Sequence, residues 1–120
     1  MIAEQLDHAT MEQKRTLSII IVNWNGKDVL PACLRSVAEN PPGVDYRVIV
    51  VDNASTDESR QWLASGEAAK LFPEGCFEVI LNDENVGFGR ANNQAMRAFP
   101  SDFFFLLNPD CTIEKKAIDC

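Results

Sequence analysis

The sequence predicts an α/β fold, a Rossmann-like parallel sheet with helices on both faces. Two observations support this prediction. Four short apolar runs alternate with segments of helical periodicity along the 120 residues. The runs at residues 17–22 and 46–51 are rich in Ile and Val, which is typical of strands buried on both faces of a parallel sheet. Such alternation leads to right-handed crossovers, and a chain of this length forms one domain.

The first strand is expected at residues 17–22 and is followed by a loop at residues 23–26. Residues 28–40 are then expected to form a helix, because apolar side chains recur at helical spacing at Leu30, Cys33, Leu34, Val37 and Ala38. Pro31 fits this helix only in its first turn, where the N–H that proline lacks would have no helical partner.

The second strand is expected at residues 46–51. Ser55 and Glu58 have the spacing of a capping box and are expected to begin the next helix, whose Trp62 would face the sheet. A third strand at residues 77–81 follows the turn-forming segment that contains Pro73.

The last elements are a helix over residues 86–99 and a fourth strand over residues 103–107. That strand contains three Phe and two Leu, so it is expected to be fully buried. A final helix is expected to begin near Ile113 or Glu114.

The two ends of the chain differ in character. Residues 1–16 are mostly polar and lack the apolar core of a signal peptide, so we expect a disordered leader. Residues 17–120 are expected to form the folded domain. The chain has no apolar run of about 18 residues, and no membrane-spanning helix is predicted.

Charge and cysteine content exclude several classes of function. The formal net charge is −7 and no basic stripe is present, which argues against binding of duplex nucleic acid. The single histidine, His8, and the absence of a CxxC pair argue against a zinc site or a Ser-His-Asp triad. The thiols are expected to be reduced, as in a cytoplasmic protein; they are Cys33, Cys76, Cys111 and Cys120.

Polar loops follow the predicted strands, and in a doubly wound sheet they would meet at one edge. The first contains Asn23, Trp24 and Asn25. Its indole could stack on a nucleobase while the two amides bind the edge of the base. Alternatively, Trp24 belongs to the core and Asn25 is a turn residue, a position that asparagine favours.

The second loop begins with Asp52 and Asn53. A carboxylate at the end of a buried strand can accept hydrogen bonds from a nucleobase or a ribose. Asp52 could instead cap the next helix, but Ser55 and Asp57 are better placed for capping. This leaves Asp52 without an evident structural role and favours ligand binding.

The third loop, at residues 85–93, contains Gly87 and Gly89 but does not complete the dinucleotide fingerprint GxGxxG, because Asn92 stands at its last position. A nicotinamide-dependent oxidoreductase is therefore disfavoured. The small residues of this segment would allow close approach to a neighbour or a ligand. Arg90 could bind a phosphate or could be an ordinary surface arginine.

The fourth polar segment is Asn108-Pro109-Asp110. Asn108 and Asp110 carry side-chain oxygens one residue apart, which can reach the same hard cation, such as Mg²⁺ or Mn²⁺, ions that prefer oxygen ligands. Taken alone the segment is a turn, but its place beside Asp52 at the same sheet edge favours a metal site.

These segments together resemble the motifs of family 2 glycosyltransferases. They read SIIIVNWN at residues 18–25, VVDNASTD at 50–57, NVGFGRANN at 85–93 and LLNPD at 106–110. This variant of the motifs is similar to the rhamnosyltransferase-like branch. The resemblance implies the N-terminal, donor-binding half of a GT-A fold and an inverting transfer from a nucleotide-diphosphate sugar, UDP- or dTDP-linked, to a glycan or lipid-linked acceptor.

The resemblance also implies roles for individual residues. Asp52 would bind the base or ribose, and Asp110, with Asn108, would hold a divalent metal on the diphosphate. The donor would also lie near residues of the other loops, namely Asn23, Trp24, Asn25, Asn53, Gly87, Arg90, Asn92 and Asn93. Two positions depart from the family pattern, because Asn108 replaces the first acidic residue of the DxD element and Asn92 stands where many members have Arg.

The family's acidic catalytic base would lie beyond Cys120, so the catalytic residue is not identified in this chain. We therefore expect a donor-binding half, truncated at its C-terminus, that binds the nucleotide sugar without transferring it. The alternative is a non-catalytic nucleotide-binding or protein-interaction module that associates through exposed apolar surface. The expected location is the cytoplasm, either free or at the membrane surface.

Overall fold

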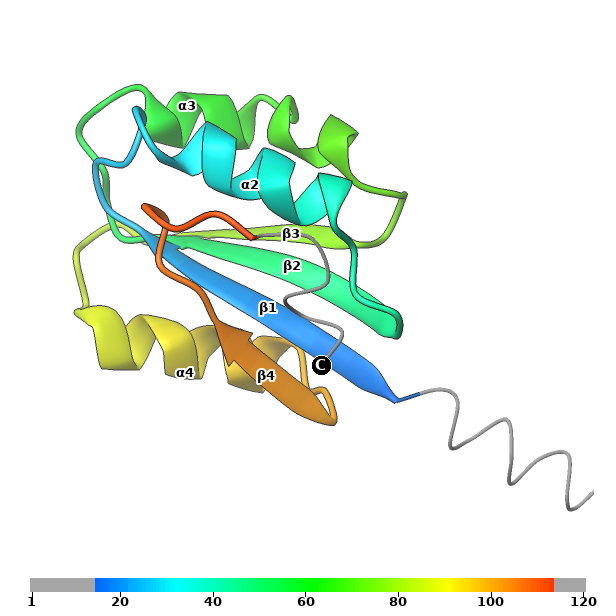
Figure 1. The fold of residues 1–120 in the computed structure, drawn as a ribbon. Helices are drawn as coiled ribbons and strands as arrows, with labels where there is room; N and C mark the ends of the chain where they lie inside the picture. Colours follow the sequence, from blue (N-terminus) through cyan, green and yellow to red (C-terminus); the bar gives the residue numbers. More distant parts are fainter. Residues whose placement is uncertain (1–14, 114–120) are drawn as a thin grey trace, which may run out of the picture.

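The computed structural model describes residues 15–113, which form one parallel sheet with strand order β3-β2-β1-β4 (Figure 1). Its strands are β1 (Thr16–Asn23), β2 (Asp45–Asp52), β3 (Phe77–Leu81) and β4 (Phe103–Leu106). The helices are α2 (Leu30–Glu39), α3 (Ser59–Ala64), the short 3-10 helix η1 (Ala68–Leu71) and α4 (Phe88–Ala98). The predicted leader lies outside the described residues apart from Arg15 and Thr16, and Thr16 belongs to β1. The predicted last helix also lies outside them, apart from Ile113.

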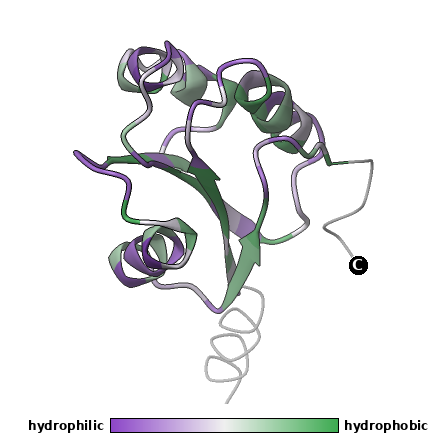
Figure 2. Ribbon diagram, turned by 90° about the vertical axis from the view of Figure 1, so that its left-hand side faces the viewer, coloured by the Kyte–Doolittle hydropathy of each residue, from purple (hydrophilic) through white to green (hydrophobic). Residues whose placement is uncertain are grey.

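Helices cover both faces of the sheet, as predicted. Helices α2 and α3 lie on one face and α4 on the other, and Figure 2 shows the largely apolar strands between them. Successive residues of β1 point to opposite faces. Ile19 and Ile21 pack with the α2 and α3 side chains, whereas Ile20 packs against Ala91 and Ala95 of α4. This alternation explains why a nearly continuous apolar run is needed at β1.

The helix starts agree with the sequence in one case and not in another. Pro31 lies in the first turn of α2, as predicted. The predicted capping box of Ser55 and Glu58 is wrong, because α3 begins at Ser59 and its N-cap Glu58 makes no side-chain capping bond. Ser55 is buried and its hydroxyl donates to Asp52 instead.

Strand β4 is not fully buried, which corrects the prediction for residues 103–107. It pairs only with β1 and forms an edge of the described sheet. Phe103 is 52% exposed, Phe104 38% and Leu106 45%, whereas Leu107, just past the strand, is buried. The run has the composition of an interior strand, but no element of the described residues covers its outer edge.

The carboxyl ends of the strands bring the polar loops together. Asn23 and Asp52 are register partners at the ends of β1 and β2. The backbone N–H of Asn82, just after β3, donates to the carbonyl of Asp52, and that of Leu107 donates to Ile20. The predicted grouping of the loops at one sheet edge is thus present. Within residues 15–113, no helix combines the length and the apolar character that crossing a membrane requires.

Candidate functional site at the carboxyl edge of the sheet

The carboxylate of Asp52 is wholly buried and accepts four hydrogen bonds. Its Oδ1 accepts from Asn23 Nδ2 at 3.0 Å and from the Ser55 hydroxyl at 2.7 Å. Its Oδ2 accepts from the Ser55 backbone N–H at 3.0 Å and from Arg60 Nη1 at 3.1 Å. Asp52 therefore has a structural role, and the expectation that it has none is wrong. It holds the loop after β2 in place.

Asn23 is the second centre of this network. Its Nδ2 also lies 2.9 Å from the Ser59 hydroxyl and 3.3 Å from that of Ser55, while its Oδ1 is buried without a partner among the described residues. Gly26 of the same loop packs directly against the side-chain amide of Asn23. A Cβ at Gly26 would lie closer than 3.0 Å to Asn23 Oδ1, so the loop requires glycine at this position.

Trp24 and Asn25 project from the same loop and differ in role. Trp24 is 57% exposed, so the alternative in which it belongs to the core is wrong. Asn25 adopts a positive φ of 53°, which suits a turn. Its Oδ1 accepts from the backbone N–H groups of Thr56, at 2.7 Å, and Asp57, at 3.2 Å. Asn25 thereby ties the two loops together, beside the exposed side chain of Trp24.

Asn53 anchors the segment that leads into α4. Its Nδ2 donates to the Gly87 carbonyl at 3.2 Å, and its Oδ1 accepts from Asn82 Nδ2 at 3.0 Å and the Val86 N–H at 3.3 Å. Asn82 and Gln94 also exchange two amide hydrogen bonds, at 2.8 and 3.0 Å. The role of Asn82 was not predicted, although a polar residue directly after a strand was the available signal.

The glycines before and within α4 do not serve the expected close approach to a protein neighbour, and their expected approach to a ligand stays a prediction. Gly87 is the N-cap and has a φ of 88°, which a side chain would strain. An added Cβ at Gly87 or Gly89 would meet nothing within 4 Å, so neither glycine serves close approach to another part of the described chain. The small residues of α4 that pack closely against the sheet are the alanines Ala91 and Ala95.

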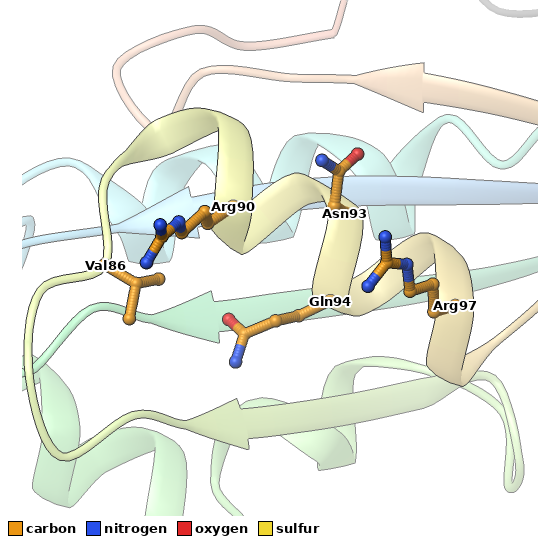
Figure 3. Close-up of a pocket in the computed structure, with 5 residues that line it drawn as sticks. All are labelled: Val86, Arg90, Asn93, Gln94 and Arg97. Atoms are coloured by element: carbon orange, nitrogen blue, oxygen red, sulfur yellow. The ribbon is translucent and has the colours of Figure 1, made fainter.

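Helix α4 separates the polar residues that were predicted to share one donor site. Asn92 is 3% exposed; its Nδ2 donates to the Phe88 carbonyl, and its buried Oδ1 has no partner within residues 15–113. Arg90 and Asn93 are exposed. They line a surface pocket of about 430 Å³ on the outer side of α4 (Figure 3), together with Val86, Gln94 and Arg97. Asn92 alone of the three points into the protein.

Asn108 and Asp110 follow β4 in an exposed turn. The Asn108 carbonyl accepts from the Cys111 N–H at 3.0 Å, and Cys111 Sγ lies 3.7 Å from Asp110 Oδ1. Exposed carboxylate and amide oxygens are ligands that suit Mg²⁺ or Mn²⁺. No group of three His, Cys, Asp or Glu side chains that could hold a metal occurs within residues 15–113. The side chains fit such an ion only if further oxygen ligands, such as phosphate, complete its shell.

Two pKa shifts describe the surroundings of these loops. Burial, with smaller effects of nearby Cys111 and Asp110, raises the pKa of the Cys33 thiol to about 12. Burial would also raise the pKa of Asp57, but hydrogen bonds from Ser59 and from the Lys27 N–H outweigh it and lower that pKa. Among the described residues, Cys33, Cys76 and Cys111 are free thiols, and Cys120 lies outside them.

A family comparison identifies the kind of protein to which this site belongs. The model of glycosyl transferase family 2 matches residues 18–119, almost the whole of the described fold. The chain belongs to glycosyl transferase family 2. The predicted family is therefore confirmed, whereas its rhamnosyltransferase-like branch stays a prediction.

Curated relatives of this family 2 domain are glycosyltransferases and a polymerase. The chain is 29% identical over 102 residues to the teichoic acid poly(glycerol phosphate) polymerase of Staphylococcus epidermidis, covering 85% of the chain and 14% of that protein. It is 33% identical over 95 residues to a PGL/p-HBAD biosynthesis glycosyltransferase of Mycobacterium tuberculosis, covering 78% of the chain and 34% of that protein. The chain thus spans about a third or less of these relatives.

Solved structures with a similar fold are GT-A glycosyltransferases. S. aureus TarS in complex with UDP-GlcNAc matches with a TM-score of 0.72 at 24% identity, over 86% of this chain and 29% of that one. The Pyrobaculum calidifontis mannosyltransferase PcManGT, in complex with GDP-Man and Mn²⁺, matches with a TM-score of 0.69 at 22% identity. The match covers 81% of this chain and 28% of that one. The predicted Rossmann-like fold of the family 2 domain is confirmed.

Proposed function

We propose that residues 17–120 form the donor-binding domain of a hexosyltransferase that moves a sugar from a nucleotide-diphosphate sugar to an acceptor hydroxyl with inversion. The observation that supports this most is the convergence of Asn23, Trp24 and Asp52 at the carboxyl edge of a family 2 fold, where open α/β sheets bind ligands. Asp110 lies in the turn after the neighbouring strand β4.

The donor is a UDP- or dTDP-linked sugar in this proposal. Its base would stack on exposed Trp24 and bind near Asp52 and Asn53, with exposed Gly87 lining the donor side. TarS structures contain UDP and UDP-GlcNAc, which supports a uridine nucleotide. The rhamnosyltransferase-like motifs favour a deoxysugar.

A divalent Mg²⁺ or Mn²⁺ ion would be held by Asp110 and Asn108, with diphosphate oxygens as further ligands. When bound, it would neutralise the negative charge that develops on the leaving diphosphate. The structure of PcManGT in complex with GDP-Man and Mn²⁺ supports such an ion. In this chain, Asp110 and Asn108 present one carboxylate and one amide oxygen to solvent. Within residues 15–113, no Lys or Arg forms an ion pair with the Asp110 carboxylate.

The acceptor and the catalytic base belong, in this proposal, to a part of a longer protein beyond Cys120. The chain alone would bind donor without transferring the sugar. A glycan or lipid-linked acceptor, as in polysaccharide biosynthesis, fits the teichoic acid relative. A lipid-linked acceptor would place the protein in the cytoplasm at the membrane surface.

A non-catalytic interaction module is the second candidate. It is favoured by the exposed apolar side chains of β4, Phe103, Phe104 and Leu106, which lie on an edge strand. Unpaired edges of this kind promote association. Light scattering separates the two candidates: this one predicts oligomers whose formation is unaffected by nucleotide.

Calorimetry with UDP tests the donor proposal. We expect UDP to bind with Mn²⁺ and to bind at least about tenfold more weakly with EDTA, a difference of about 1.4 kcal/mol. Asp110→Asn should remove the Mn²⁺ dependence. Glu74→Gln, which removes one exposed carboxylate outside the site, should not. A folded chain that binds no UDP at any Mn²⁺ concentration would refute the proposal.

A further inference from the structure

Arg60 covers the carboxylate that the donor site needs. It lies in α3, and its Nη1 donates to Asp52 Oδ2 at 3.1 Å and to the Asn82 carbonyl at 2.8 Å. Its side chain is 29% exposed, whereas that of Asp52 is fully buried. Arg60 thus bridges the ends of β2 and β3 and lies between Asp52 and solvent.

The four hydrogen bonds of Asp52 leave no acceptor site for a ligand. An ionised carboxylate offers about four lone-pair positions, and Asn23, Ser55 and Arg60 fill them. Asn23 and Ser55 are buried and belong to the loops that shape the site. Arg60 is the donor that is partly exposed and carried on a long side chain. A ligand N–H or O–H can therefore reach Asp52 most readily by replacing Arg60.

A second carboxylate is available to the displaced guanidinium. Arg60 Nη2 already lies 3.9 Å from Asp83 Oδ1, and the Asp83 side chain is fully exposed. Moving Arg60 outward would shorten this weak contact while its bond to Asp52 breaks. The arginine would remain paired with a carboxylate in both positions, which lowers the cost of the exchange.

We propose that Arg60 is a movable cover of the nucleotide site, displaced from Asp52 Oδ2 by a hydrogen-bond donor of the base or ribose. The inference rests on the proposed function, in which Asp52 accepts that hydrogen bond. Arg60 is then a positioning residue that acts through Asp52. A nucleotide must break the bond between Arg60 and Asp52 in order to bind, and the cost of breaking that bond weakens its affinity. A purely structural Arg60 would instead support the loop, and its loss would weaken binding or leave it unchanged.

Calorimetry on the full chain with UDP and Mn²⁺ tests this inference. Arg60→Gln should bind UDP about tenfold more tightly than wild type even though its melting temperature falls, because the competing charge is gone. Arg60→Lys, which can still pair with Asp52, should bind within about threefold of wild type. Arg35→Gln removes the same charge from an exposed position of α2 and should change nothing.

The outcomes distinguish this inference from the donor proposal. Absence of UDP binding by wild type would refute the donor proposal and, with it, the cover. Wild-type binding together with equal or weaker binding by Arg60→Gln would overturn the cover alone.

Should Arg60→Gln fail to fold, NMR of the wild-type guanidinium groups decides. The Arg60 signals, assigned by their absence in Arg60→Lys, should show restricted rotation in the free chain and lose it on addition of UDP. Arg60 signals that do not change at saturating UDP would overturn the inference.

Discussion

Replacing Gly26 by alanine should disrupt the polar network that shapes the proposed base site. The new Cβ would lie closer than 3.0 Å to Asn23 Oδ1. Asn23 is fully buried and its amide is held by Asp52 and Ser59, so it cannot turn aside without losing those bonds. Either the loop at residues 23–26 moves or the amide leaves its place.

The expected magnitude follows from the bonds that Asn23 would lose. Its bond to the Asp52 carboxylate involves a charged acceptor and contributes about 1.5–3 kcal/mol, and its bond to the neutral Ser59 hydroxyl contributes about 0.5–1.5 kcal/mol. We therefore expect Gly26→Ala to lower the free energy of unfolding by about 2–4 kcal/mol. With a typical urea m-value, this moves the unfolding midpoint down by roughly 1–2 M.

Urea unfolding followed by circular dichroism measures this change. Gly89→Ala is the matched control, because nothing lies within 4 Å of its added Cβ and the residue is helical. It should be neutral or stabilise the chain by up to about 1 kcal/mol. A Gly26→Ala midpoint equal to that of wild type would refute the reasoning on the Asn23 network.

Three further predictions concern other parts of the molecule. Iodoacetamide at pH 8 should label exposed Cys111 quickly and Cys33 only on unfolding. Iodoacetamide reacts with the thiolate, and burial raises the pKa of the Cys33 thiol to about 12. Equal labelling rates of the two cysteines, measured by mass spectrometry, would contradict this. The pKa of Asp57 is lowered, against the effect of burial, chiefly by a hydrogen bond from Ser59, so its stabilisation is present above the ordinary aspartate pKa of about 4 and is lost as pH falls through the lower folded pKa. Asp57→Asn should therefore flatten the loss of stability on acidification, and urea titrations from pH 6 to pH 2 that superimpose on wild type would count against it. Phe104→Lys should reduce any self-association seen by light scattering, since Phe104 is exposed on the edge strand, and unchanged oligomers would place the interface elsewhere.

The burial of a strand was predictable from the sequence where other parts of the chain cover that strand. Strands β1 and β2 lie in the centre of the sheet, between α2 and α4, and their Ile and Val content indicates this environment. Strand β4 has the same apolar character but an exposed outer edge. The apolar composition of a strand predicts that its side chains need to be buried. It does not predict whether the described residues bury them.

The positions of the site residues were predictable, but their partners were not. Placement at strand ends followed from the alternation of elements, and Asn23 and Asp52 do meet there. Their mutual hydrogen bond joins residues 29 positions apart, and Arg60 completes the network from a third segment. Local patterns such as the spacing of Ser55 and Glu58 favour a capping box, but the Ser55 hydroxyl instead donates a hydrogen bond to the buried carboxylate of Asp52.

Helix α4 shows a second limit of the sequence. Arg90 and Asn92 stand two residues apart in one motif and were assigned to one donor site. On a helix, residues two apart do not face the same side. Asn92 is buried, while Arg90 lines the outer pocket with Arg97.

A crystal structure of the chain with UDP and Mn²⁺ tests the central claim most directly, that the carboxyl edge of the sheet is a nucleotide-sugar site. We predict an anomalous Mn²⁺ peak at coordination distance, about 2.1 Å, from an Asp110 oxygen, with the base beside Trp24 and Asp52. UDP bound on the outer side of α4 between Arg90 and Arg97, with no Mn²⁺ at Asp110, would contradict the claim.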